Sequence, residues 1–89
     1  MKTRQLTIPN KLGLHARAAA RLVNTASQFE SDIYLEKEQT RVNGKSIMGV
    51  MMLAAAQGTV ITIIADGQDE EAALEAVQQL VEAGFGEEQ

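Results

Sequence analysis

The stretch Thr-Val-Ile-Thr-Ile-Ile-Ala, residues 59–65, decides how this chain folds. It is the most β-prone segment of the sequence, and its composition predicts a central strand of a sheet. The segments on either side are typical of helices. Upstream, Ser46 is a predicted N-cap for a short helix over Ile47 to about Ala56 that ends before Gln57-Gly58. Downstream, Asp69 is the predicted cap of a last helix that runs to about Ala83.

The rest of the chain completes a small sheet and adds one more helix. We predict a strand over Lys2–Ile8 and a hairpin that joins Ser31–Glu36 to Thr40–Val42. A helix is predicted over Ala16 to about Phe29, and Phe85 is expected to fold back onto the core. The order is then β-α-β-β-α-β-α in a single domain, 1–89. Three amphipathic helices suffice to cover one face of a four-stranded sheet. The predicted inward stripes of the first and last helices are Ala19, Leu22, Val23 and Ala26, and Ala73, Ala76, Val77 and Leu80.

Charge and the supply of reactive side chains exclude several classes of function. Eight Lys plus Arg against twelve Asp plus Glu give a net charge of −4, whereas nucleic acid binding requires a basic face. Because cysteine is absent and histidine occurs once, zinc–thiolate, iron–sulfur and multi-histidine metal sites are excluded. The longest mostly apolar run, Ile47–Ala56, falls short of the ~20 residues of a membrane span. We expect a soluble cytoplasmic protein with no signal peptide and no cofactor.

The single histidine lies in a context that favours phosphate binding. The stretch reads Asn10-Lys11-Leu12-Gly13-Leu14-His15-Ala16-Arg17-Ala18, which places His15 between a glycine turn and the predicted start of a helix. The first N–H groups of a helix have no intrahelical partner, and the positive end of the helix dipole attracts anions. Arg17, in the first turn, has the planar guanidinium that binds phosphoryl oxygens. The alternative is that His15, as a lone histidine, is only a surface or capping residue, and its position between the turn and the helix favours a functional role.

Two motifs give the chain a family resemblance. Gly13-Leu14-His15-Ala16-Arg17, followed by a helix, resembles the active-site motif of HPr, the histidine-containing phosphocarrier of the bacterial phosphotransferase system. Asn43-Gly44-Lys45-Ser46-Ile47-Met48-Gly49-Val50-Met51-Met52-Leu53 resembles the regulatory-serine segment of the same family. The motifs stand in the right order and at the right separation, and the resemblance covers essentially the whole chain. It implies an α+β fold of the HPr type, an open-faced β-sandwich with three helices on one side of a four-stranded antiparallel sheet.

The resemblance also implies roles for individual residues. His15 matches the histidine that accepts a phosphoryl group from phospho-enzyme I and passes it to a downstream acceptor domain of the EIIA type. Arg17 matches the arginine that stabilises and guides that group. Ser46 matches the serine that, in some bacteria, is phosphorylated by HPr kinase/phosphorylase. The alternative for Ser46 is a helix cap with no regulatory role, worth about 1 kcal/mol.

A patch around His15 is expected to dock these partners. In the family, the patch binds enzyme I and the acceptor domains, and small or adaptable side chains suit it. The alternative interpretation makes the methionines core residues, although Val50, Leu53 and Ala54 suffice as the inward face of the short helix. We call the following eight residues the docking face: Ala16, Ala20, Arg21, Asn24, Ile47, Met48, Met51 and Met52.

One position departs from the family pattern. HPr proteins usually carry proline after the active-site arginine, and this chain has Ala18 there. Alanine is a good helix former, adds one N–H near the phosphate site and lifts the constraint that proline imposes on Arg17. Because no chemical group is lost, we expect phosphorylation of His15 to survive.

The pattern favours a carrier over an enzyme, with two alternatives left open. No Asp or Glu lies near His15 in the sequence, and Glu87-Glu88-Gln89 is predicted to be a solvated tail; whether a carboxylate approaches in space is open. The carrier belongs either to the sugar branch or to the nitrogen-branch paralogue, whose relay regulates rather than transports. The run Met51-Met52-Leu53-Ala54-Ala55-Ala56 and the Gly84-Phe85 ending favour the nitrogen branch somewhat, and the sequence alone leaves both open. The second alternative is a regulatory binding module controlled by phosphorylation of Ser46. The presence of both His15 and Arg17 favours the carrier, which we expect to be a monomer.

Overall fold

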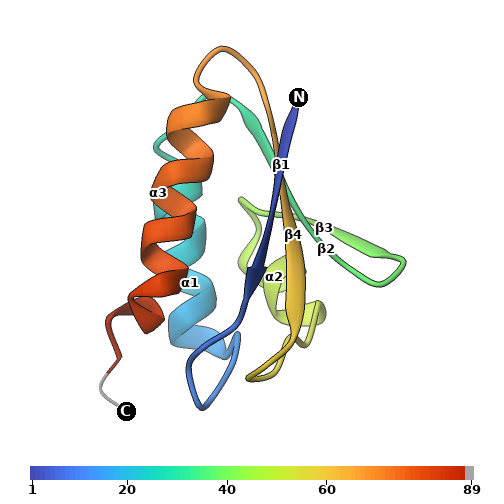
Figure 1. The fold of residues 1–89 in the computed structure, drawn as a ribbon, viewed down its shortest axis with the longest axis vertical. Helices are drawn as coiled ribbons and strands as arrows, with labels where there is room; N and C mark the ends of the chain where they lie inside the picture. Colours follow the sequence, from blue (N-terminus) through green and yellow to red (C-terminus); the bar gives the residue numbers. More distant parts are fainter. Residues whose placement is uncertain (88–89) are drawn as a thin grey trace.

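Residues 1–87, the part of the chain that the computed structural model describes, form four strands and three α-helices in the predicted order (Figure 1). A short 3₁₀ turn follows the last helix. The elements are β1 (Lys2–Thr7), α1 (Ala16–Ala26), β2 (Asp32–Lys37), β3 (Thr40–Asn43), α2 (Ile47–Met52), β4 (Val60–Asp66), α3 (Glu70–Glu82) and η1 (Gly84–Gly86).

β4, the strand predicted to be central, lies between two other strands of the sheet. The sheet order is β1-β4-β2-β3, and every neighbouring pair is antiparallel. On β4, Ile61 and Ile63 are buried, and they pair in register with Leu6 of β1 and Leu35 of β2, which are buried as well. The longest strand, richest in branched aliphatic residues, thus takes the position with a partner on both sides.

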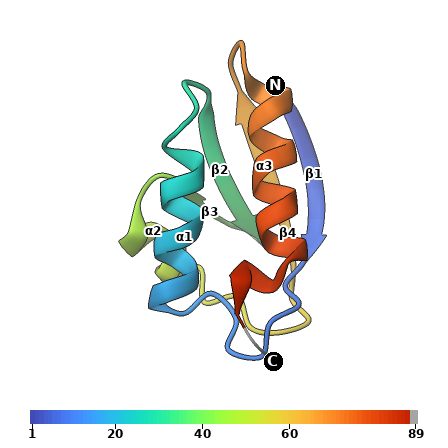
Figure 2. The ribbon, with the colours of Figure 1, turned by 90° about the vertical axis from the view of Figure 1, so that its left-hand side faces the viewer.

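All three helices lie against one face of the sheet, as Figures 1 and 2 show from two sides, and the other face is open. The four residues predicted as the inward stripe of α1 are all buried, and Ala18 is buried beside them. In α3, Ala73 and Val77 are buried as predicted, Ala76 and Leu80 are partly exposed, and Leu74 and Val81 complete the core instead. Phe85 folds back and is fully buried, which confirms that prediction.

Two predicted helices are shorter than expected. α1 ends at Ala26, three residues before Phe29. α2 ends at Met52 and not near Ala56, because Ala54 has a φ of 54°, outside the right-handed helical region. Ala54 is consequently exposed and does not belong to the inward face of α2, whereas Val50 and Leu53 are buried as predicted.

Asp69 precedes α3 as predicted, but its side chain does not cap that helix. Its carboxylate accepts hydrogen bonds from the backbone N–H groups of Glu30 and Ser31, both at 2.9 Å, and from the Ser31 hydroxyl. These bonds, led by the one from the Ser31 hydroxyl, hold the pKa of Asp69 below its ordinary value. The residue therefore ties the start of β2 to the start of α3.

A substitution at Gly13 tests the turn that positions the start of α1. Gly13 has a φ of +65°, and a Cβ there would overlap the Ala55 carbonyl oxygen and lie 2.9 Å from the Ala56 Cα. We expect Gly13→Ala to lower the free energy of unfolding in urea by about 3 kcal/mol, through backbone strain and steric overlap together. Gly58 is the matched control, because its φ is +86° but nothing lies within 4 Å of a Cβ.

Gly58→Ala should cost only about 1 kcal/mol, the strain alone. Equal losses for the two variants would show that the contact with Ala55 contributes nothing.

Candidate functional site

His15 is the N-cap residue of α1, in extended conformation with φ −75° and ψ 177°. Its carbonyl accepts the first helical hydrogen bond, from the N–H of Ala19 at 2.8 Å. The N–H groups of Ala16, Arg17 and Ala18 lie ahead of that bond, and N–H groups in this position have no intrahelical acceptor. The His15 ring makes no capping hydrogen bond and is 27% exposed. An accessible imidazole therefore lies at the positive end of a helix of 11 residues.

The loop before His15 is held by its own hydrogen bonds and by the segment after α2. The N–H of Gly13 donates to the Asn10 carbonyl at 3.2 Å, and the N–H of Leu14 donates to the Ala55 carbonyl at 2.9 Å. The Asn10 side chain is fully buried and donates from Nδ2 to the Gly13 carbonyl at 2.8 Å. The ring of His15 thus projects from a fixed backbone.

A carboxylate from the C-terminal segment approaches the His15 ring. Glu87 Oε1 lies 2.8 Å from His15 Nε2 and accepts a second hydrogen bond from Asn10 Nδ2, also at 2.8 Å. The hydrogen bond from His15 holds the pKa of Glu87 below its ordinary value, and the charge of Arg21 contributes in the same direction. The Glu87 side chain is only 12% exposed.

The prediction of a solvated tail is therefore wrong for Glu87, while Glu88 and Gln89 lie outside the described residues. Sequence reasoning missed this contact because 72 positions separate the partners. The one signal for it was Phe85, whose return to the core brings the following residues beside α1.

The two nitrogens of the His15 ring have different surroundings. Nε2 faces the Glu87 carboxylate, whereas Nδ1 has no hydrogen-bond partner within residues 1–87. An ionised carboxylate accepts hydrogen bonds only, so Nε2 must carry a proton in this contact. In the neutral ring, Nδ1 then holds the free lone pair.

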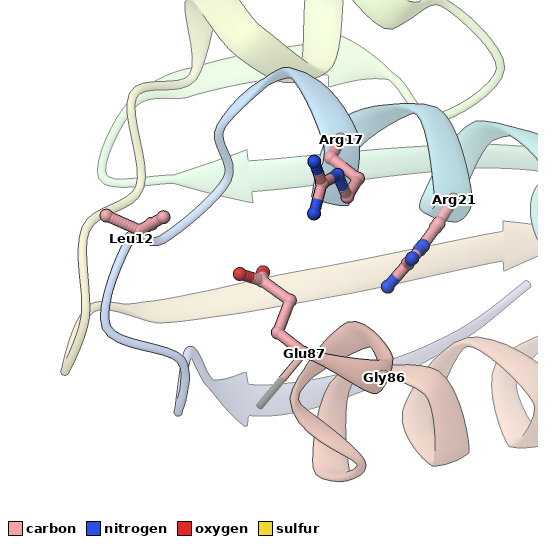
Figure 3. A pocket seen from close by; sticks show the side chains of 5 residues that line it. All are labelled: Leu12, Arg17, Arg21, Gly86 and Glu87. Carbon is pink, nitrogen blue, oxygen red and sulfur yellow. The ribbon is translucent and has the colours of Figure 1, made fainter. Parts of the chain in front are cut away.

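A pocket of about 450 Å³ opens beside this pair, lined by Leu12, Arg17, Arg21, Gly86 and Glu87. Figure 3 shows both arginine side chains extending from α1 toward Glu87. Arg21 donates to the Phe85 carbonyl oxygen. The side chain of Arg17 is exposed and makes no hydrogen bond or ion pair with any other residue that the structure describes. The guanidinium of Arg17 is thus available to an incoming anion.

The eight residues of the docking face are accessible. Met48 and Met52 are 70% and 74% exposed, and Ile47 and Met51 are 43% and 40% exposed. The interpretation of these methionines as core residues is therefore wrong. From α1, which packs against α2, Ala16, Arg21 and Asn24 are exposed and Ala20 is half-buried. Leu12, 69% exposed, is a further large apolar side chain near His15 that the sequence pattern did not single out.

Ser46 begins α2 as its N-cap. Its hydroxyl oxygen accepts a hydrogen bond from the Gly49 N–H at 3.1 Å, and the residue is half-buried. The predicted cap is confirmed.

Neither a metal site nor a membrane span is found in the described part of the chain. Residues 1–87 contain no group of three or more metal-ligating side chains. No helix among them is both long enough and apolar enough to cross a bilayer.

The chain is similar in sequence to known phosphocarriers. A family model described as "PTS HPr component phosphorylation site" matches residues 2–83. The phosphocarrier protein HPr of Neisseria meningitidis serogroup A is 54% identical over 87 residues, which cover 98% of each chain. The phosphocarrier protein NPr of Shewanella violacea is 45% identical over 84 residues, 94% of this chain and 92% of that protein.

Solved structures of HPr proteins are similar to this chain in both sequence and fold. The crystal structure of HPr-C-His from Thermoanaerobacter tengcongensis superposes with a TM-score of 0.96 at 52% identity, over 100% of both chains. An HPr dimer from the same organism matches with a TM-score of 0.79 at 52% identity, over 98% of this chain and 100% of that chain. With the family model spanning most of the sequence and relatives of this identity over its full length, the chain belongs to the HPr family of phosphocarrier proteins.

Proposed function

We propose that this chain carries phosphoryl groups on His15 between enzyme I of the phosphotransferase system and a downstream acceptor domain of the EIIA type. The observation that carries the proposal is the asymmetry of the His15 ring at the start of α1. Nε2 lies 2.8 Å from the Glu87 carboxylate, whereas Nδ1 has no hydrogen-bond partner within residues 1–87, and His15 itself is the N-cap of α1. Membership of the HPr family supports the same role.

The transfer is an in-line displacement at phosphorus. The Nδ1 lone pair forms the new N–P bond while the bond from phosphorus to the donor breaks, and the donor atom retains that electron pair. The dianionic group then lies near the N–H groups of Ala16, Arg17 and Ala18 and within reach of the Arg17 guanidinium. The same step in reverse passes the group to the acceptor.

We infer that the chain is a relay component and not an enzyme by itself, because the phosphoryl group leaves only when a partner presents a nucleophile. A shuttle of this kind meets its partners through the docking face, where Arg21, together with Arg17 beside the face, offers positive charge to an acidic surface. We propose that it acts in the cytoplasm as a monomer. The greater identity to the HPr relative than to the NPr relative supports the sugar branch.

Regulation through Ser46 is a smaller, separate proposal. A phosphate there would add roughly −1.5 to −2 charges at the edge of the docking face and repel an acidic partner. The hydroxyl serves as a cap in the unmodified protein, so the carrier function does not depend on its modification.

The carrier is tested by incubating the protein with phosphoenolpyruvate and a catalytic amount of sugar-branch enzyme I. We expect an acid-labile mass increase of one phosphate, absent in His15→Ala. Arg17→Ala should slow the reaction roughly 10- to 100-fold, because one charged donor to the phosphoryl oxygens is lost. Arg41→Ala is the control, since Arg41 is an exposed arginine on β3 that pairs with Glu36.

Phosphate retained in the His15→Ala variant, or an equal effect of the two arginine variants, would contradict these roles.

The family departure at position 18 gives a further prediction. Ala18→Pro removes an N–H that has no intrahelical acceptor, at a first-turn position that tolerates proline. We expect the variant to be phosphorylated at a rate within about tenfold of the unmodified chain, measured by rapid quench. A loss beyond about 100-fold would identify the Ala18 N–H as an essential phosphoryl ligand.

A further inference from the structure

The Glu87 carboxylate is held in place by more than its contact with His15. Phe85 is fully buried, and its carbonyl oxygen accepts a hydrogen bond from Arg21 of α1. The N–H of Glu87 donates to the Gly84 carbonyl at 3.1 Å, which closes the η1 turn. The carboxylate is therefore attached to a backbone that the core and α1 both anchor.

Asn10 fixes the carboxylate oxygen that contacts the ring. Its Nδ2 donates both to the Gly13 carbonyl and to Glu87 Oε1, each at 2.8 Å. Because the Asn10 side chain is fully buried, its amide has little freedom to turn away. The loop before His15 and the carboxylate beside His15 are thus joined through one amide group.

We propose that Glu87 is a positioning residue for His15: by accepting the Nε2–H, it holds the ring in the orientation and tautomer that present the Nδ1 lone pair to the phosphoryl donor. This inference rests on the proposed function and adds to it a residue outside the two sequence motifs. The carboxylate touches the ring and not the phosphoryl group, so it acts through His15.

The same contact offsets the charge that the transfer creates. When Nδ1 forms its bond to phosphorus and the donor atom leaves with its electron pair, the proton on Nε2 stays in place and the ring becomes cationic. The Glu87 carboxylate, 2.8 Å from that nitrogen, faces the new positive charge. When the N–P bond breaks in the onward transfer, the ring returns to its neutral form with the same proton on Nε2. No proton leaves the site in either direction.

Two readouts on Glu87→Ala separate positioning from a merely structural role. The first is the pair of ¹⁵N signals of the His15 ring at neutral to mildly alkaline pH, which report the tautomer without phosphorylation. In the unmodified chain we expect Nδ1 at the position of an unprotonated ring nitrogen. In Glu87→Ala the two signals should move toward each other, as the tautomer protonated on Nδ1 gains population.

The second readout is the single-turnover rate of phosphorylation at saturating phospho-enzyme I. It should fall about tenfold in Glu87→Ala, the factor expected for loss of a charge-assisted hydrogen bond of ordinary strength, with the concentration for half-saturation little changed. Glu71→Ala is the matched control. It removes the same charge from the start of α3, where Glu71 pairs with Lys2, and should leave both readouts unchanged.

Unchanged nitrogen signals in Glu87→Ala, together with a rate within twofold of the unmodified chain, would overturn the proposal. A higher concentration of phospho-enzyme I for half-saturation, with unchanged nitrogen signals, would overturn the proposal as well, because Glu87 would then be a docking residue. If the unmodified chain accepts no phosphoryl group, the proposed function fails, and the nitrogen signals alone still decide whether Glu87 sets the tautomer of His15.

Discussion

The close approach of Gly13 to the backbone of Ala55 is the constraint on which the site depends. Gly13 adopts a left-handed conformation where no side chain fits, and the next residue, Leu14, bonds to the Ala55 carbonyl. This contact docks the loop between β1 and α1 onto the segment that joins α2 to β4. It determines where α1 starts, and therefore where His15 lies relative to α2 and its exposed methionines. The same turn therefore positions both His15 and the proposed docking face.

The ring of His15 has one nitrogen turned toward protein and one left for a partner. That division suits a carrier, which must accept a phosphoryl group and release it again without holding it too tightly. In the proposed function, the helix start and Arg17 bind the phosphoryl oxygens, and the structure adds the Glu87 carboxylate 2.8 Å from the other ring nitrogen, Nε2. Because every one of these groups lies on α1 or beside its first turn, a partner can reach the site without any opening of the fold.

Local patterns predicted most of the fold. The branched aliphatic run of β4 indicated the central strand, and the spacing of apolar residues in α1 indicated its buried face. Predictions failed where an unusual backbone conformation or a contact between residues distant in the sequence determines the local structure. The left-handed Ala54 ends α2 early, and the carboxylate of Asp69 binds residues 30 and 31 in place of its own helix.

The candidate site was also predicted only in part, because its local motifs are visible in the sequence and its long-range contact is not. His15, Arg17 and the docking face belong to continuous motifs, which a sequence displays directly. Glu87 belongs to no motif, and its approach to His15 follows only from the burial of Phe85 and the turn at Gly84.

The most direct test of the account is to identify the ring nitrogen that carries the phosphoryl group. The protein is labelled with ¹⁵N in its histidine, phosphorylated, and studied by NMR for coupling between ³¹P and each ring nitrogen. We expect coupling to Nδ1, with Nε2 still protonated and facing Glu87. Coupling to Nε2 would contradict it, because the phosphoryl group would then occupy the position that the Glu87 carboxylate holds in the unphosphorylated protein.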